Sequence, residues 1–121
     1  MGRPDSLASR LEACLDVLDR LDGESRDTLV RLWAAEDELA DARAALERAE
    51  RRLTIRGVDG KNAAERVARM AAQLPREHEA VAAAERSVRA ARRDRDEHQA
   101  ALELVRLRLK ALEVLTSVRS G

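Results

Sequence analysis

Cys14 and His98 are the first candidates for chemistry, because a thiolate beside an imidazole can act as a nucleophile or hold a metal ion. If the two halves of the chain pair antiparallel, both residues fall at core positions near Leu18. A zinc site needs further ligands, however, and a Cys–His nucleophile needs a third group that orients the imidazole. His78 lies in a charged stretch after Pro75, and we expect it to face solvent. We therefore predict no catalytic residues, no metal and no cofactor.

The segment 57–62 reads GVDGKN and places a Gly-Lys pair ahead of a predicted helix. A phosphate-binding loop requires the pattern G-x-x-x-x-G-K-[ST] after a β-strand. Here Gly57 and Gly60 are too close together, Asn62 replaces the hydroxyl residue, and the preceding segment is predicted to be a helix. A turn followed by a helix N-cap is the better interpretation.

The composition predicts an all-α protein. Hydrophobic residues make up 45% of the 121 residues and charged residues 38%, whereas Trp33 is the only aromatic residue. Sheets need β-branched and aromatic side chains, so this composition excludes a sandwich, a barrel or a Rossmann core. The length allows one domain, which we place over residues 1–121. The formal net charge of zero gives no reason to expect nucleic acid or a membrane as an obligatory partner.

Apolar residues in the first half of the chain recur at alternating spacings of four and three. This period of 3.5 is the signature of a coiled-coil seam. The pattern keeps its phase across Gly23, so we predict one helix over residues 6–53 with a local bend at the glycine. The seam positions are Leu7, Leu11, Cys14, Leu18, Leu21, Ser25, Thr28, Leu32, Ala35, Leu39, Ala42, Leu46, Ala49 and Leu53.

The seam ends in a glycine-containing turn, predicted over residues 54–62. Asn62 stands three residues before Glu65, the arrangement of an N-cap with a capping-box carboxylate. A new helix is therefore predicted over residues 63–74. Pro75 disfavours helical geometry at the residue before it, so we expect a kink there and a further helix over residues 76–118.

The second seam has the same spacing as the first and continues in phase through Pro75. Two seams of equal length joined by a short loop predict a long antiparallel helical hairpin of coiled-coil type. With the turn centred on Val58, Leu32 should lie beside Ala84, and Leu18 beside His98. The second seam comprises Ala63, Val67, Met70, Leu74, Glu77, Val81, Ala84, Val88, Ala91, Arg95, His98, Leu102, Val105, Leu109, Leu112 and Thr116.

Four polar residues interrupt the two seams and gather in one region of the predicted pairing. Polar core residues weaken a seam but specify its alignment. We therefore assign a register-setting role to Ser25, Thr28, Arg95 and His98.

A single helical hairpin buries only one stripe on each helix, which barely offsets the entropy cost of ordering it. Additional apolar side chains lie off the seams, and exposed clusters of this kind usually mark an interface. We therefore predict a homodimer, forming a four-helix bundle, and an unidentified protein partner. The predicted interface residues are Leu29, Val30, Trp33, Leu104, Leu107, Val114, Leu115 and Val118.

Charge is unevenly distributed along the chain. Residues 12–41 hold ten acidic and three basic residues, a net charge of −7, and residues 86–95 hold five basic residues and one acidic residue, net +4. In the predicted register the basic run lies beside residues 21–30, where Asp22, Glu24 and Asp27 would meet arginines of the other helix. This mutual neutralisation is the interpretation we favour.

The predicted hairpin tip carries seven basic residues against Glu50, Asp59 and Glu65, a net charge of +4 over residues 48–69. It has no acidic segment opposite and no aromatic residue for base stacking. Any nucleic-acid binding is therefore expected to be weak, sequence-independent and salt-dependent. The basic residues are Arg48, Arg51, Arg52, Arg56, Lys61, Arg66 and Arg69.

The turn GVDGKNAAER at residues 57–66, followed by a helix rich in Ala, Glu and Arg that ends LRLKAL, resembles small helical proteins of bacteriophages and prophages. The resemblance covers residues 53–115 and rests on a turn of the type G-K/S-N-x-x-x-R between two helices. It implies a phage accessory protein in the host cytoplasm, without known catalytic residues.

These observations together predict a non-enzymatic, self-associating helical adaptor in phage DNA metabolism or in the control of host machinery. The first alternative is a nucleic-acid binder that uses the basic tip. The second is a virion assembly or scaffolding component. No run of about 18 apolar residues and no secretory signal occurs, and Cys14 has no partner for an intramolecular disulfide. We expect a cytoplasmic protein that does not enter a membrane.

Overall fold

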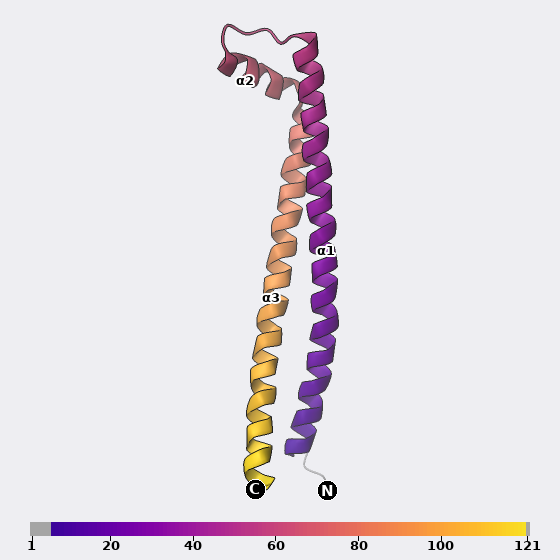
Figure 1. Cartoon of the computed structure of the whole chain (residues 1–121), viewed down its shortest axis with the longest axis vertical. Helices are drawn as coiled ribbons and strands as arrows, with labels where there is room; N and C mark the ends of the chain where they lie inside the picture. The colour runs from indigo at the N-terminus through magenta and orange to yellow at the C-terminus, as the bar shows by residue number, and fades with distance from the viewer. Residues whose placement is uncertain (1–5, 121) are drawn as a thin grey trace. The chain divides into compact units, whose positions relative to one another are not determined.

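The structure, a computed structural model, describes residues 6–120. It contains three helices and, within these residues, no strand, so the prediction of an all-α protein is confirmed. The helices are α1 (Leu7–Arg56), α2 (Ala63–Gln73) and α3 (Pro75–Ser120), as Figure 1 shows. Their bounds lie within three residues of the expected ranges 6–53, 63–74 and 76–118.

α1 begins where a side chain satisfies its first backbone donors. The Ser6 hydroxyl accepts a hydrogen bond from the Ser9 N–H (3.2 Å), which makes Ser6 the N-cap. The helix then continues through Gly23 without interruption. It stops at Gly57, whose φ of +85° favours glycine and whose N–H donates to the Thr54 carbonyl (3.2 Å).

α2 begins with the N-cap that the sequence predicts. The Asn62 Oδ1 accepts a hydrogen bond from the Glu65 N–H (2.8 Å). The Glu65 carboxylate in turn accepts from the Lys61 N–H (3.2 Å), one residue earlier than the capping box requires. Gly60 allows this tight turn, because a Cβ there would lie 2.6 Å from the Arg66 Cγ.

Pro75 separates α2 from α3. Leu74 has φ −123° and ψ 47°, outside helical geometry, as expected for a residue before proline. Its N–H still donates to the Ala71 carbonyl (3.2 Å), and its carbonyl accepts from the His78 N–H (3.0 Å). Pro75 occupies the first position of α3, where the N–H that proline lacks is not needed. The proline therefore produces a one-residue break.

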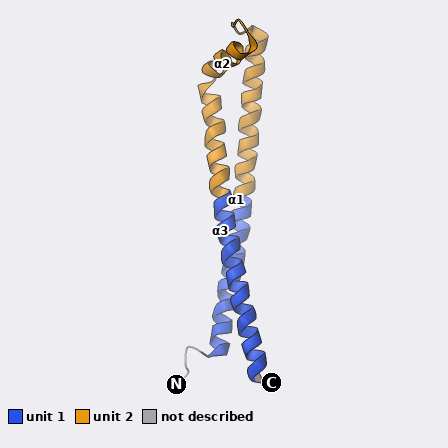
Figure 2. Cartoon of the chain, turned by 90° about the vertical axis from the view of Figure 1, so that its left-hand side faces the viewer, with its two compact units in different colours: residues 1–30, 92–121 blue, residues 31–91 orange. Residues whose placement is uncertain are grey.

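The chain divides into two compact units, shown in different colours in Figure 2. One unit comprises residues 1–30 and 92–121, of which 6–30 and 92–120 are described. The other comprises residues 31–91. Because α1 and α3 each extend through both ranges, each unit pairs a segment of α1 with a segment of α3.

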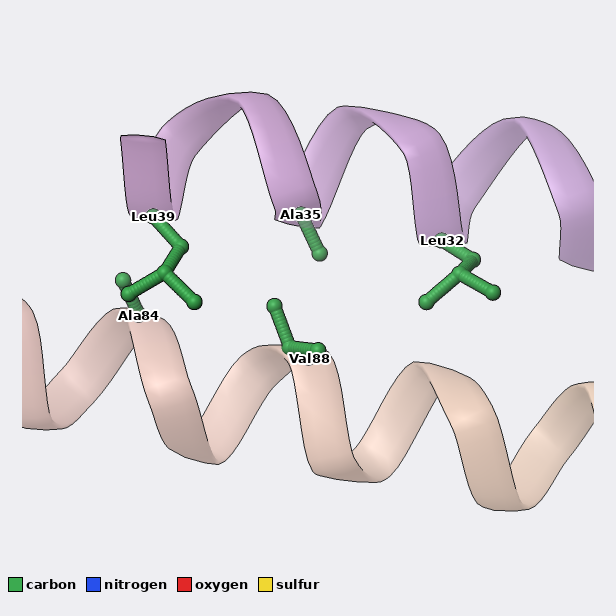
Figure 3. Packing of buried hydrophobic residues seen from close by; sticks show 5 residues of the cluster. All are labelled: Leu32, Ala35, Leu39, Ala84 and Val88. Carbon is green, nitrogen blue, oxygen red and sulfur yellow. The ribbon is translucent and has the colours of Figure 1, made fainter. Parts of the chain in front are cut away.

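The core of the unit 31–91 is a single layer of small and branched side chains between α1 and α3. Leu32 and Val88 are each 3% exposed, and Ala35, Leu39 and Ala84 are also buried. In Figure 3, Leu39 lies beside Ala84, Ala35 points toward Val88, and Leu32 lies on the far side of Val88. Leucines on α1 thus pack over small residues of α3, which allows the two helices to approach closely.

The unit containing residues 1–30 and 92–121 has a second, separate core. Leu21 of α1 packs with Leu102 and Val105 of α3, and all three are buried. Half-buried neighbours widen this cluster on both helices, namely Cys14, Val17, Leu18 and Ala101.

The predicted alignment of the two seams is wrong by about one heptad in each unit. Ala84 lies beside Leu39, seven residues after the expected Leu32. His98 contacts Glu24 (3.4 Å), six residues after the expected Leu18. A heptad pattern repeats every seven residues, so a shift of one heptad buries the same kinds of position. Centring the turn on Val58 accounts for part of the error, because the loop extends to Asn62, and the break at Leu74 contributes because the prediction treated α2 as an in-phase part of the second seam.

We predict that cysteine pairs will report this alignment in a Cys14→Ser background. Ala35→Cys with Val88→Cys should form a disulfide readily under mild oxidation, because these two side chains face each other. The matched pair Leu32→Cys with Ala84→Cys would be adjacent in the alignment expected from the sequence. In the observed alignment this pair should stay reduced. Non-reducing electrophoresis and mass spectrometry measure both. Faster oxidation of the second pair would contradict the observed alignment.

Candidate functional site

The two residues with the clearest chemical potential do not come together. The Cys14 thiol donates to the Val105 carbonyl (3.5 Å) and is half-buried. His98 precedes Val105 by seven residues, which is about 10 Å of helix rise. The expected Cys14–His98 proximity is therefore wrong, and its cause is the one-heptad difference in alignment.

His98 joins α3 to α1 instead. Its Nδ1 lies 2.9 Å from the Asp94 carbonyl oxygen and its Nε2 lies 3.4 Å from the Glu24 Oε2. A carbonyl and a carboxylate both accept hydrogen bonds, so each ring nitrogen faces an acceptor. The ring is half-buried, and its proximity to Glu24 joins α3 to α1.

The other polar seam residues lie around this contact. Thr28 is 1% exposed, and its hydroxyl donates to the Ser25 carbonyl (2.7 Å). Since Glu24 meets His98, the antiparallel direction aligns Ser25 with His98 and Thr28 with Arg95. Arg95 turns its guanidinium toward Asp96, with contacts of 2.9 and 3.1 Å. No buried side-chain nitrogen or oxygen among residues 6–120 lacks a hydrogen-bond partner.

Three charged residues that the acidic and basic runs would pair across the helices have an ion-pair partner on their own helix, namely Asp22, Glu24 and Arg86. Asp22 pairs with Arg26 (3.0 Å), and Glu24 lies 3.9 Å from Arg20. Arg86 pairs with Glu79 (2.9 Å) on its own helix. Partners one or two turns apart on one helix are already close, so they pair without a long-range constraint.

All seven basic residues of the predicted tip are exposed in the unit 31–91. Two of them have local partners, because Arg69 pairs with Glu65 (2.9 Å) and Arg66 donates to the Gly60 carbonyl (3.3 Å). These contacts fasten the loop to α2. The side chains exposed around the loop without such a contact include Arg51, Arg52 and Arg56.

The predicted interface residues lie outside both cores. Leu29 is half-buried, and the other seven are more than half exposed or at that limit. Their exposed fractions run from Leu115 at 50% to Val118 at 72%, with Trp33 at 59%. The seven are Val30, Trp33, Leu104, Leu107, Val114, Leu115 and Val118.

A groove of about 460 Å³ lies between the start of α1 and the end of α3. Its size is that of a small-molecule pocket. Most residues that line the groove are apolar. Its polar lining groups are the Cys14 thiol and the side chains of Arg10 and Arg108. Such a surface suits an apolar side chain of a partner better than a polar ligand. The apolar lining residues are Ala13, Val17, Val105, Ala111 and Leu112.

Sequence reasoning missed three exposed apolar residues. Leu15 is 46% exposed, Val67 66% and Ile55 85%. Leu15 and Ile55 each lie off the seam, a signal present in the sequence. Val67 is a seam position, but α2 leaves none of its residues buried.

The described residues provide neither a metal site nor a membrane-spanning helix. Residues 6–120 contain no group of three or more His, Cys, Asp or Glu side chains placed to hold a metal ion. None of the helices in this range combines the length and apolar character needed to cross a bilayer. No family model matches the chain, and neither a curated protein nor a solved structure matches it.

We predict that buried and exposed leucines of α3 will differ sharply in their effect on folding. Leu102→Ala should lower the free energy of unfolding by about 2 to 5 kcal/mol, because it leaves a cavity in the core with Leu21. The control Leu107→Ala, at a position 65% exposed, should change it by less than about 1 kcal/mol. Urea denaturation of dilute protein measures both. Equal losses would show that Leu107 belongs to the folding core.

Proposed function

We propose that this protein is a non-enzymatic, self-associating interaction module. In this proposal α1 and α3 form an antiparallel coiled-coil hairpin, and copies of the chain associate through four helices as a homodimer. The module also binds an unidentified protein partner. One observation carries the proposal: large apolar side chains, including Trp33 and Leu107, remain exposed on helices whose inner faces are already packed. Surfaces of this kind usually mark interaction sites.

The use of the chemically versatile residues supports a structural role. Cys14 bonds to a backbone carbonyl, and His98 bonds to a carbonyl and a carboxylate. The Cys14–Val105 and His98–Glu24 contacts each join α1 to α3, so these side chains already serve the pairing of the two helices.

The two exposed apolar regions suit two different tasks. The leucines and valines of α3 lie in one unit, within residues 92–121, and we assign them to self-association. Trp33 on α1 is the only aromatic residue, and we assign it to the protein partner because exposed tryptophans are enriched among binding hot spots. The resemblance of the turn to phage-encoded helical proteins extends this proposal to a phage accessory protein, acting in DNA metabolism or on host machinery.

We expect sedimentation velocity to show a reversible dimer between roughly 1 and 100 μM. Trp33→Ala should leave this equilibrium and the helix content unchanged but reduce the set of proteins that co-purify from native cells. Asp37→Ala, at another exposed position of α1, is the matched control. A chain that remains monomeric at every concentration would refute self-association, and unchanged co-purification by Trp33→Ala would remove its assigned role.

A second candidate function is nucleic-acid binding, which the cluster of exposed basic side chains in the unit 31–91 favours. Arg51, Arg52 and Arg56 lie beside the loop, where Gly57 leaves the backbone open to an anion. Without aromatic residues for stacking, the contacts would be electrostatic.

We predict weak binding to single- and double-stranded DNA at low salt, measured by fluorescence anisotropy. Replacing Arg51, Arg52 and Arg56 together by alanine should abolish it, because electrostatic contacts to phosphate would supply the whole of this weak binding. The control removes the same charge elsewhere, through Arg89→Ala, Arg93→Ala and Arg106→Ala. Binding that survives raised salt, or that responds equally to both triple variants, would rule out the basic tip.

A further inference from the structure

α3 carries a second periodic apolar stripe in the unit that contains residues 92–121. Its inner seam faces α1, with Leu102 and Val105 at 5% and 8% exposure. Other apolar residues repeat the same alternation of four- and three-residue spacings but are all exposed. We call these residues the outer stripe: Ala100, Leu104, Leu107, Ala111, Val114 and Val118.

The outer stripe lies nearly opposite the inner seam, since the helix turns about 100° per residue. Leu107 is 65% exposed and Val118 72%. A surface helix with one neighbour normally shows a single apolar face. A second face with a period of 3.5 is a seam for another helix, because only a helix presents side chains at matching intervals along this length. The stripe spans 19 residues, about 28 Å of helix.

We infer that the outer stripe pairs with the outer stripe of a second copy in parallel orientation, around a two-fold axis that runs along the helices. This inference rests on the proposed self-association and assigns its surface and direction.

Charges beside the stripe select the second copy and its direction. With Leu104 and Ala111 as a positions and Leu107 as a d position, Glu103 occupies a g position and Arg108 the following e position. These are the positions that form ion pairs between parallel helices. Parallel pairing therefore places Glu103 of each copy against Arg108 of the other. Both residues are exposed, and neither forms an ion pair within residues 6–120.

The opposite orientation is electrostatically unfavourable. An antiparallel pair that overlaps the whole stripe has its two-fold axis at Leu109, midway between Ala100 and Val118. That axis would bring Arg108 of one copy beside Arg108 of the other, and Lys110 of one copy beside Lys110 of the other. Like charges facing each other across a helical interface are destabilising, whereas the parallel pair has two attractive contacts.

The area of the stripe fits a second copy bound reversibly. Covering its exposed side chains on both copies removes on the order of 1,000 Å² from water, the lower limit of specific interfaces. α3 is already held as a helix by α1, so association does not have to order it. We therefore expect a dissociation constant in roughly the micromolar range.

Charge exchange tests the orientation by sedimentation equilibrium. Glu103→Arg and Arg108→Glu should each weaken self-association roughly fivefold, and the double variant should restore it because the pairs are remade with their signs exchanged. Antiparallel pairing predicts no loss from Arg108→Glu, because that variant only exchanges an Arg–Arg repulsion for a Glu–Glu repulsion, and it predicts that Arg108→Ala would relieve the repulsion and tighten the dimer. That result, or no effect of either variant on an existing dimer, overturns the inference.

Cysteine cross-linking in a Cys14→Ser background tests the surface itself. Leu107→Cys should form an intermolecular disulfide with its own copy, since equivalent core positions are neighbours in a parallel pair. Asp16→Cys, an equally accessible site on α1, should not. Cross-linking of Leu107→Cys only when mixed with Ala111→Cys would show antiparallel pairing and overturn the inference. A dimer that forms no disulfide through Leu107→Cys, either alone or mixed with Ala111→Cys, refutes the outer stripe but leaves self-association standing. A strictly monomeric chain refutes self-association as well.

Discussion

The contact between the apolar seams of α1 and α3 is the constraint on which the rest of the structure depends. Each unit has one thin core, built from Leu32, Leu39 and Val88 in one case and from Leu21 and Leu102 in the other. With almost no aromatic volume available, stability requires many small contacts spread along the helices. Every residue on the remaining faces is therefore left to solvent or to partners, which explains why so many large apolar side chains are exposed.

A repeating seam does not by itself specify one alignment, and the polar seam residues show how the two alignments differ. In the alignment expected from the turn, Ser25 and Thr28 would face Val88 and Ala91, and His98 would face Leu18. The Thr28 hydroxyl bonds to the Ser25 carbonyl of its own helix, so this bond does not depend on the alignment. His98 differs between the two alignments, because in the observed one it meets the Glu24 carboxylate. The apolar seams supply the packing in both.

The two-sided character of α3 connects this folding constraint to function. Near residues 100–118 the inner seam is committed to α1, so the outer stripe contributes little to the fold and can serve association. In the proposed dimer, the separation of the two tasks onto opposite faces would let the copies dissociate without unfolding. The basic residues around the loop belong to the other unit, so the proposed binding of nucleic acid would use a different surface.

The sequence alone determined the elements. A composition poor in aromatic residues required helices. Glycine ended the first helix, the Asn62 cap started the second, and Pro75 separated α2 from α3. These signals are readable in the sequence because caps and helix breakers act within a few residues of themselves. The sequence also identified the polar seam residues and most exposed apolar ones. Only the tertiary structure decided the alignment, and with it the partners of His98 and Cys14, since alignments one heptad apart bury equivalent positions and differ only in contacts between distant segments.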